Sequence, residues 1–161
     1  MEKMQVVVRS MKEEDLLIIS ELYVRAYKIY SQWEHWNSEA ARQLFEHWLK
    51  RQPDMSFVAE YDDKVVGAFV GGIKPWWDGN HLVDWELVVD PEYQKKGIGK
   101  LLLKVALEKA VEKHNATLCE AVTFKKTKFP LSWYKRIEFN EIKEWTMIGG
   151  DIKEVLKKLK K

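Results

Sequence analysis

The chain of 161 residues lacks most features of a secreted, metal-binding or membrane protein. Its only cysteine is Cys119, which excludes an intrachain disulfide and a cysteine-based zinc cluster. No apolar run approaches the roughly 18–20 residues that cross a bilayer, and the N-terminus lacks the apolar core of a signal peptide. We therefore expect a cytoplasmic protein with no metal and no membrane partner, folded as one domain over residues 1–161.

An excess of charge of one sign is also missing. Lys and Arg number 27 against 25 Asp and Glu, which gives a net charge of +2. The two signs are interspersed along most of the chain, whereas a nucleic-acid-binding protein would carry a strongly basic stripe. We therefore expect no nucleic-acid partner. The chain is 46% apolar and 32% charged, which is typical of a folded globular domain.

Alternating strand and helix patterns predict an α/β (α+β) chain in the order β-α-α-β-β-β-α-β-α-β plus a C-terminal helix. Ser10 is expected to cap the first helix and Pro53 to end the second. Asp62-Asp63 predicts a hairpin turn, and residues 75–80 predict the next one. Strands are expected at residues 5–9, 57–61, 64–73, 81–90, 118–124 and 141–148, and later helices at 97–114, 131–136 and from 151 onward.

The most informative segment is Trp85–Leu102, in which a buried strand runs into a loop that opens a long helix. Gly97 and Gly99 fall in the first helical turn, where the lack of side chains lets backbone N–H groups approach a ligand. A helix N-terminus suits a pyrophosphate, and Lys95, Lys96 and Lys100 add positive charge beside it. Neither a nucleotide triphosphatase loop nor a complete dinucleotide fingerprint is present in the sequence.

The run Gln94-Lys95-Lys96-Gly97-Ile98-Gly99 resembles the Gln/Arg-x-x-Gly-x-Gly/Ala signature of the GNAT superfamily of acyl-CoA N-acyltransferases. Residues 133–139 resemble a late segment of that family, although Glu138 stands where a glycine is usual. The resemblance implies a GNAT fold: a mixed, mostly antiparallel, splayed sheet of six to seven strands flanked by helices. It also implies acetyl-CoA as co-substrate, an amine acceptor and a homodimer. Leu87, Val88 and Val89 would pair with the pantetheine arm, and residues 94–100, including Ile98 and Lys100, would hold the pyrophosphate.

The same resemblance implies that Tyr134 faces the sulfur of CoA and stabilises or protonates the leaving thiolate. The general base stays open, because Trp85 and Val83 occupy the family's usual base positions and cannot accept a proton. Glu120 and Glu86 are the leading candidates. Further candidates are Asp84, expected on the same strand face as Glu86, and His81.

An aromatic region that includes Tyr30, Trp33 and Trp85 predicts an acceptor site able to hold a cationic amine. Ordinary packing of these rings in a core is the competing interpretation. The favoured function is transfer of an acetyl group from acetyl-CoA to a primary amine of a small molecule, by direct attack in a ternary complex. The alternatives are a protein lysine or N-terminal amine acetyltransferase and a non-catalytic acyl-CoA-sensing module.

Overall fold

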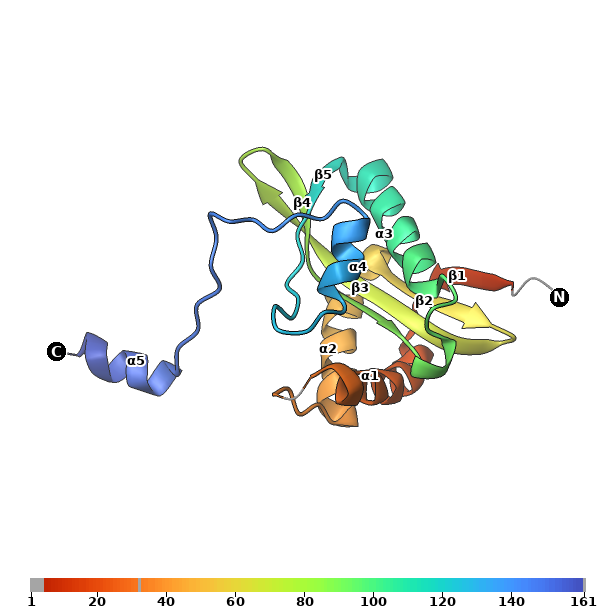
Figure 1. Ribbon diagram of the computed structural model, residues 1–161, viewed down its shortest axis with the longest axis horizontal. Helices are drawn as coiled ribbons and strands as arrows, with labels where there is room; N and C mark the ends of the chain where they lie inside the picture. Colours follow the sequence, from red (N-terminus) through yellow and green to blue (C-terminus); the bar gives the residue numbers. More distant parts are fainter. Residues whose placement is uncertain (1–4, 32, 161) are drawn as a thin grey trace. The chain divides into compact units, whose positions relative to one another are not determined.

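The computed structural model describes residues 5–31 and 33–160. The chain forms two compact units, Met1–Thr123 and Phe124–Lys161. The first unit contains a sheet with helices on both faces, and the second contains two short helices (Figure 1). The loop-to-helix segment predicted to bind pyrophosphate lies entirely within the first unit.

The sheet of the first unit is mixed and mostly antiparallel, as the sequence predicted. Its strands follow one another in chain order, with the first four antiparallel and the last parallel to its neighbour. They are β1 (Val6–Ser10), β2 (Ser56–Tyr61), β3 (Lys64–Trp76), β4 (Gly79–Val89) and β5 (Ala116–Cys119). β5 begins and ends earlier than the expected 118–124, so Glu120 follows the strand instead of lying within it.

The described residues form five strands instead of the expected six or seven. The segment 141–148 of the second unit is not a strand, and its apolar side chains Ile142, Trp145, Met147 and Ile148 are exposed. An alternating pattern makes a strand only where a neighbouring strand pairs with its backbone groups. The alternating pattern at 141–148 therefore indicated a segment that could form a strand, but it could not show whether a neighbouring strand would pair with it.

Two layers of helix enclose the sheet. α1 (Leu16–Tyr30) and α2 (Ser38–Arg51) cover one face, and α3 (Ile98–His114) covers the other (Figure 1). Leu22, Tyr23 and Phe45 of the helix pair are fully buried together with Val58 and Val70 of the sheet. Burial of such side chains contributes roughly 1.5–3 kcal/mol each. On the other face, β3 carries Gly67, where an added Cβ would lie 3.0 Å from Leu102 of α3.

The hairpin turns follow from their residues. Asp62 and Asp63 have φ of 51° and 57°, the left-handed geometry of a type I′ turn, which confirms the predicted hairpin between β2 and β3. The next turn is shorter than expected, because β3 continues to Trp76 and pairs there with Gly79. Only Trp77 and Asp78 connect β3 to β4, so the prediction of a turn over residues 75–80 was wrong in length.

The start of the first helix also differs from the prediction. Ser10 does not cap it, since this residue belongs to β1 and pairs with Phe57. Instead, the carboxylate of Asp15 accepts a hydrogen bond of 2.8 Å from the backbone N–H of Lys12, at the start of a 3-10 turn, η1 (Glu13–Asp15). The helix therefore begins at Leu16.

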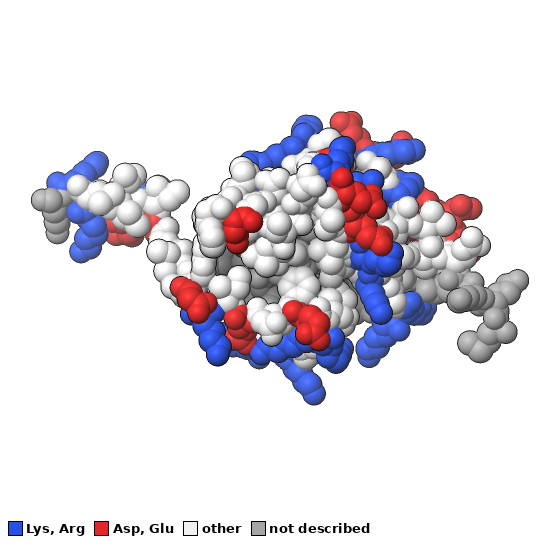
Figure 2. Space-filling view, turned by 90° about the horizontal axis from the view of Figure 1, so that it is seen from above, with Lys and Arg blue, Asp and Glu red and all other residues white. Residues whose placement is uncertain are grey.

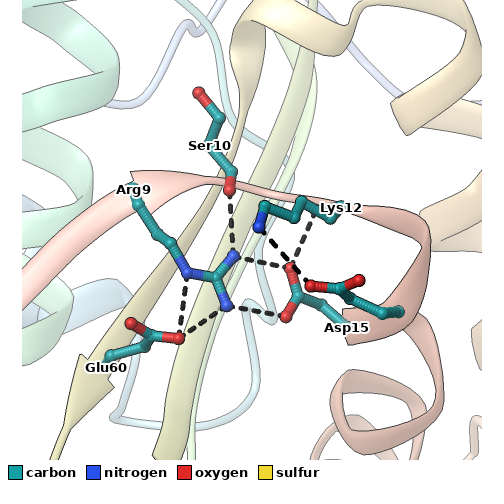
Figure 3. Close-up of polar contacts among 6 residues, drawn as sticks. Arg9, Ser10, Lys12, Asp15 and Glu60 are labelled. Carbon is teal, nitrogen blue, oxygen red and sulfur yellow. Dashed lines mark hydrogen bonds and ion pairs between the residues drawn. The ribbon is translucent and has the colours of Figure 1, made fainter. Parts of the chain in front are cut away.

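Arg9 holds this helix start against the sheet (Figure 3). Its guanidinium donates two hydrogen bonds of 2.8 Å to the buried Asp15 and two, of 2.6 Å and 2.9 Å, to Glu60 of β2. Burial alone would raise the pKa of Asp15, but the bonds from Arg9 and Lys12 more than offset it, so the net shift is downward. A carboxylate that is only 4% exposed is thus kept ionised by a fixed cation.

The second unit contains α4 (Leu131–Arg136) and α5 (Ile152–Leu159). α4 begins after Pro130, as predicted. Asp151 caps α5 by accepting from the backbone N–H groups of Lys153 and Glu154. The apolar side chains of α5, which are Ile152, Val155, Leu156 and Leu159, are exposed.

Candidate active site

A β-bulge interrupts β4 in its middle. Val70 and Gly72 of β3 pair with Glu86 and Val83, so Gly71 alone opposes both Asp84 and Trp85. Asp84 has φ of 50°, the left-handed conformation in which a non-glycine residue is uncommon. A bulge disrupts the ladder of backbone hydrogen bonds and leaves backbone groups free for other partners.

The bulge also changes which face each side chain occupies. Paired residues share a face, so Val83 and Glu86 lie on the same face although they are three residues apart. Asp84 is exposed, which corrects the expectation that it shares a face with Glu86. The sequence held a signal for the bulge in Gly71, where an added Cβ would lie 2.7 Å from the Cβ of Trp85.

Glu86 is held on the α1 side of the sheet. Its Oε2 accepts hydrogen bonds from the hydroxyls of Tyr23, at 3.0 Å, and Tyr27, at 3.3 Å. Burial raises the pKa of Glu86 to about 7, the charge of Glu34 adds to the rise, and the two tyrosine hydrogen bonds partly offset it. Near neutral pH this carboxyl therefore exists in both forms, as a proton acceptor requires.

The sheet opens on the other edge of β4. β5 pairs with β4 only at Asn80, His81 and Leu82, and the backbone N–H of Glu120 extends the contact with a bond of 2.9 Å to the Leu82 carbonyl. Within residues 5–31 and 33–160, the stretch of β4 from Val83 to Val89 has no strand beside it on that edge. This is the splay that the family resemblance implied.

Glu120 lies beside His81 at the closed end of this splay. Its Oε1 is 2.6 Å from Nδ1 of His81, while Nε2 of the same ring is 2.8 Å from Asp78 Oδ1. His81 is 2% exposed. It therefore ties the β3–β4 turn to the residue that follows β5, and one oxygen of Glu120 is already engaged.

The loop after β4 leads to a helix N-terminus that has no side-chain cap. A 3-10 turn, η3 (Pro91–Tyr93), is followed by Gln94 and then by α3, whose N-cap is Gly97. The first N–H groups of a helix lack intrahelical acceptors, and glycine has no side chain to satisfy them. Lys95, Lys96 and Lys100 are exposed around this end, so an anion would meet both free donors and positive charge.

The two glycines of this loop serve different needs. Gly97 has φ of 84°, and nothing lies within 4 Å of an added Cβ, so its conformation, and not space, favours glycine. At Gly99 an added Cβ would make an ordinary contact of 3.6 Å with Val89. Only the first position of the motif therefore depends on glycine for backbone geometry.

Helix α1 is bonded directly to this loop. Arg25 donates to Asp90 Oδ2 at 2.6 Å, and Asp90 Oδ1 accepts from the backbone N–H of Glu92 at 3.1 Å. The hydroxyl of Tyr30 donates to Oε1 of Gln94, whose Nε2 donates to the Val89 carbonyl at 3.0 Å. These ties were not foreseen, because they join residues 65 and 64 positions apart that no local pattern connects.

A cavity of about 370 Å³ lies beside the C-terminal half of α1. Its lining is Val24, Tyr27, Lys28, Ser31, Glu34, His35 and Trp36. Tyr27 connects it to Glu86, and Trp36 donates from Nε1 to Glu34 at 2.9 Å. The cavity thus combines aromatic rings with a carboxylate.

The three residues predicted to contact the acceptor lie in different places. Tyr30 and Trp33 are absent from the described lining of the cavity, and Trp33 is 52% exposed. Trp85 is buried and stacks on Phe69, with ring centroids 5.7 Å apart. Because Phe69 and Gly67 lie on one face of β3, this stack is on the face that α3 covers. Their role in acceptor binding stays a prediction.

In the second unit, Tyr134 sits on α4 with its ring 5.5 Å from that of Phe139. Its carbonyl accepts from the backbone N–H of Phe139 at 3.1 Å. Glu138 adopts φ of 71°, the left-handed conformation that the family's usual glycine would adopt easily. Glutamate thus occupies a backbone conformation that glycine favours.

The charged surface agrees with the mixed pattern of the sequence. On the face shown in Figure 2, Lys and Arg side chains lie interspersed with Asp and Glu. No helix in the described parts of the chain is long and apolar enough to cross a membrane. Among these same residues, no group of three or more His, Cys, Asp or Glu side chains could hold a metal ion.

A splayed sheet whose fourth strand, β4, runs through a loop into an uncapped helix is the arrangement that the resemblance to the GNAT superfamily implied. The sequence profile of the Acetyltransferase (GNAT) family matches residues 16–139. The chain therefore belongs to this family. It is 30% identical over 145 residues to an uncharacterized N-acetyltransferase of Methanocaldococcus jannaschii. The aligned region spans 86% of this chain but only 63% of that relative.

Solved structures support the fold. A possible acetyltransferase from Clostridium difficile 630 superimposes with a TM-score of 0.75 at 18% identity, over 91% of this chain and 97% of the other. A predicted acetyltransferase from Clostridium acetobutylicum, solved with acetyl-CoA, gives a TM-score of 0.64 at 15% identity, over 90% and 96%. These likenesses confirm the expected GNAT fold, with fewer strands described than predicted.

Proposed function

We propose that this chain transfers the acetyl group of acetyl-CoA to a primary amine of a small molecule, by direct attack in a ternary complex. The observation that carries this proposal is the position of the Glu86 carboxyl, which lies one residue beyond the bulge and accepts a hydrogen bond from Tyr27 in the wall of a cavity. We also propose that residues 1–161 act as one acetyltransferase domain and that Tyr134 is a catalytic residue.

The loop and helix after β4 would hold acetyl-CoA. Its pyrophosphate would meet the backbone N–H groups of residues 96–100, and its pantetheine arm would pair along Leu87–Val89 in the splay. The uncapped end of α3 and the open edge of β4 support this placement. The acetyl group would then lie near the bulge, where backbone N–H groups can stabilise an oxyanion.

Glu86 is the general base that the geometry supports best. A substrate ammonium must lose a proton before its nitrogen attacks the thioester, and a carboxyl with a pKa near 7 accepts protons efficiently at neutral pH. Glu120, the other leading candidate, already has an oxygen 2.6 Å from His81. Asp84 points to the surface instead of toward α1.

In the reaction, Glu86 accepts the ammonium proton directly or through water, and the neutral nitrogen then forms a C–N bond as the C–S bond breaks. The second proton that this nitrogen sheds passes to the leaving thiolate or to solvent. Tyr134 would donate a hydrogen bond to the leaving thiolate. A covalent route through Cys119 is disfavoured, because burial raises the pKa of this thiol to about 12, the charge of Glu120 adds to the rise, and a bond from Trp85 only partly offsets it.

The cavity beside α1 supports a small amine as acceptor. Tyr27 and Trp36 line it with aromatic rings, which attract cations, and Glu34 adds a carboxylate. Its volume of about 370 Å³ falls within the roughly 300–1,000 Å³ of small-molecule sites.

The test is thiol release from acetyl-CoA, with separate pools of polyamines, amino acids, aminoglycosides and peptides as acceptors. We expect release with one small-amine pool. Release with peptides alone would replace the small-molecule proposal by a protein acetyltransferase, and acetyl-CoA binding without release from any pool would favour a sensing module. Tyr134→Phe should lower turnover while the Kd for acetyl-CoA stays unchanged, and undiminished turnover would remove Tyr134 from the mechanism.

A further inference from the structure

The pyrophosphate loop has few anchors of its own. Lys95, Lys96 and Gly97 are exposed, and Lys95 and Gly97 both adopt left-handed backbone conformations, with φ of 61° and 84°. A loop in such a conformation keeps its shape only where neighbouring side chains hold it. Gln94, at the start of this exposed stretch, connects it to helix α1 and to the end of β4.

Both ends of the Gln94 amide are engaged. Oε1 accepts from the hydroxyl of Tyr30, the last residue of α1, and Nε2 donates to the carbonyl of Val89, the last residue of β4. An amide with a donor at one end and an acceptor at the other has one favoured orientation. Gln94 is therefore a bridge between the helix end and the strand end.

We propose that Tyr30 is a positioning residue for acetyl-CoA binding: its hydroxyl orients Gln94, and Gln94 in turn sets the loop that receives the pyrophosphate. This inference rests on the proposed function, since it requires acetyl-CoA at this loop. It assigns to Tyr30 a role on the CoA side of the molecule, whereas its aromatic character alone predicted contact with the acceptor.

The fold itself does not depend on this hydroxyl. α1 is anchored through fully buried side chains such as Ile19, Leu22 and Tyr23, whereas Tyr30 is only half-buried and ends the helix. A second tie, from Arg25 to Asp90, holds the beginning of the loop region independently. Loss of the Tyr30 hydroxyl should therefore change the loop without unfolding the helix.

The first experiment measures the Kd for acetyl-CoA by calorimetry, and KM for both substrates, in the full-length wild type and in Tyr30→Phe. Loss of one hydrogen bond should weaken acetyl-CoA binding roughly three- to tenfold. The melting temperature, kcat and acceptor KM should stay close to wild type. Tyr61→Phe is the matched control, because Tyr61 packs on Tyr93 of the same region, with ring centroids 5.9 Å apart, and should leave binding unchanged.

The second experiment asks whether Tyr30 acts through Gln94. Gln94→Leu removes both ends of the bridge and should weaken binding at least as much as Tyr30→Phe. In the Gln94→Leu background, Tyr30→Phe should have no further effect.

Additive losses in the double variant would overturn the inference, as would unchanged acetyl-CoA binding in Tyr30→Phe. A rise in acceptor KM alone would also overturn it and return Tyr30 to the acceptor site. Failure of the wild type to bind acetyl-CoA would contradict the proposed function instead, so the two failures are distinguishable.

Discussion

Replacing Glu86 by Gln should stabilise the protein, and increasingly so as the pH rises. The folded state raises the pKa of this carboxyl from an ordinary 4.5 to about 7. The folded state therefore binds the proton more tightly than the unfolded state does. Stability from this group is complete below about pH 4.5 and declines as the pH rises, until the carboxyl is fully ionised above about pH 7.

The size of this effect follows from the same two values. At 1.36 kcal/mol for each pH unit, the ionised Glu86 lowers the free energy of unfolding by about 3 kcal/mol above pH 7. Glutamine keeps an oxygen that can accept from Tyr23 and Tyr27 but carries no charge. Glu86→Gln should thus melt roughly 6–12 °C higher than wild type at pH 8 and within a degree or two of it at pH 4.5.

Thermal unfolding at several pH values measures this difference. Glu112→Gln is the control, because Glu112 is 70% exposed and its replacement should leave the melting temperature close to that of wild type at every pH. A difference between Glu86→Gln and wild type that does not grow with pH would refute the burial argument. In activity assays, loss of the acidic limb near pH 7 in Glu86→Gln, with that limb kept in Glu120→Gln, would identify the base. The reverse result would assign this role to Glu120.

Two further predictions concern backbone geometry and a buried ion pair. Gly97→Ala should lower the free energy of unfolding by about 1–2 kcal/mol and weaken acetyl-CoA binding, because a φ of 84° is unfavourable for alanine. Gly99→Ala should be tolerated. Equal effects of the two substitutions on urea unfolding and on calorimetric binding would contradict this distinction. Arg9→Met leaves the buried Asp15 carboxylate without its cation and should cost on the order of 3 kcal/mol, whereas Arg42→Met, at an exposed ion pair, should cost less than about 1 kcal/mol. Comparable losses for the two arginines would disprove the role of the Arg9 pair.

Local patterns predicted the elements that local physics determines. The Asp62-Asp63 turn, the helix after Gly97 and the Asp151 cap all follow from residues within a few positions of one another. The family motif predicted a pyrophosphate loop at residues 94–100, and the structure has an exposed loop there that leads into a helix without a side-chain cap. The fold class followed because alternation of strands and helices leaves few architectures.

The site's chemistry was less predictable, because it depends on contacts between distant segments. The bulge at Asp84 and Trp85 arises where Gly71 lets two backbones approach, and alternation along β4 alone could not reveal it. Glu86 became the favoured base only when Tyr23 and Tyr27 were seen to bury it. The prediction of a strand at 141–148 was wrong for a related reason. A strand forms only where a neighbouring strand pairs with its backbone, and the sequence of the segment itself does not show whether such a neighbour is present.

Helix α1 connects the two halves of the candidate site through one stripe of tyrosines. Tyr23, Tyr27 and Tyr30 are spaced four and three residues apart, so they project from the same side of the helix. The first two bond to Glu86 in the middle of β4, and the third bonds to Gln94 just beyond the end of that strand. α1 therefore runs along β4 from the candidate base to the candidate CoA loop. A rotation or shift of this helix would change the environment of both at once, so under the proposed function the position of α1 would couple amine deprotonation to acetyl-CoA binding.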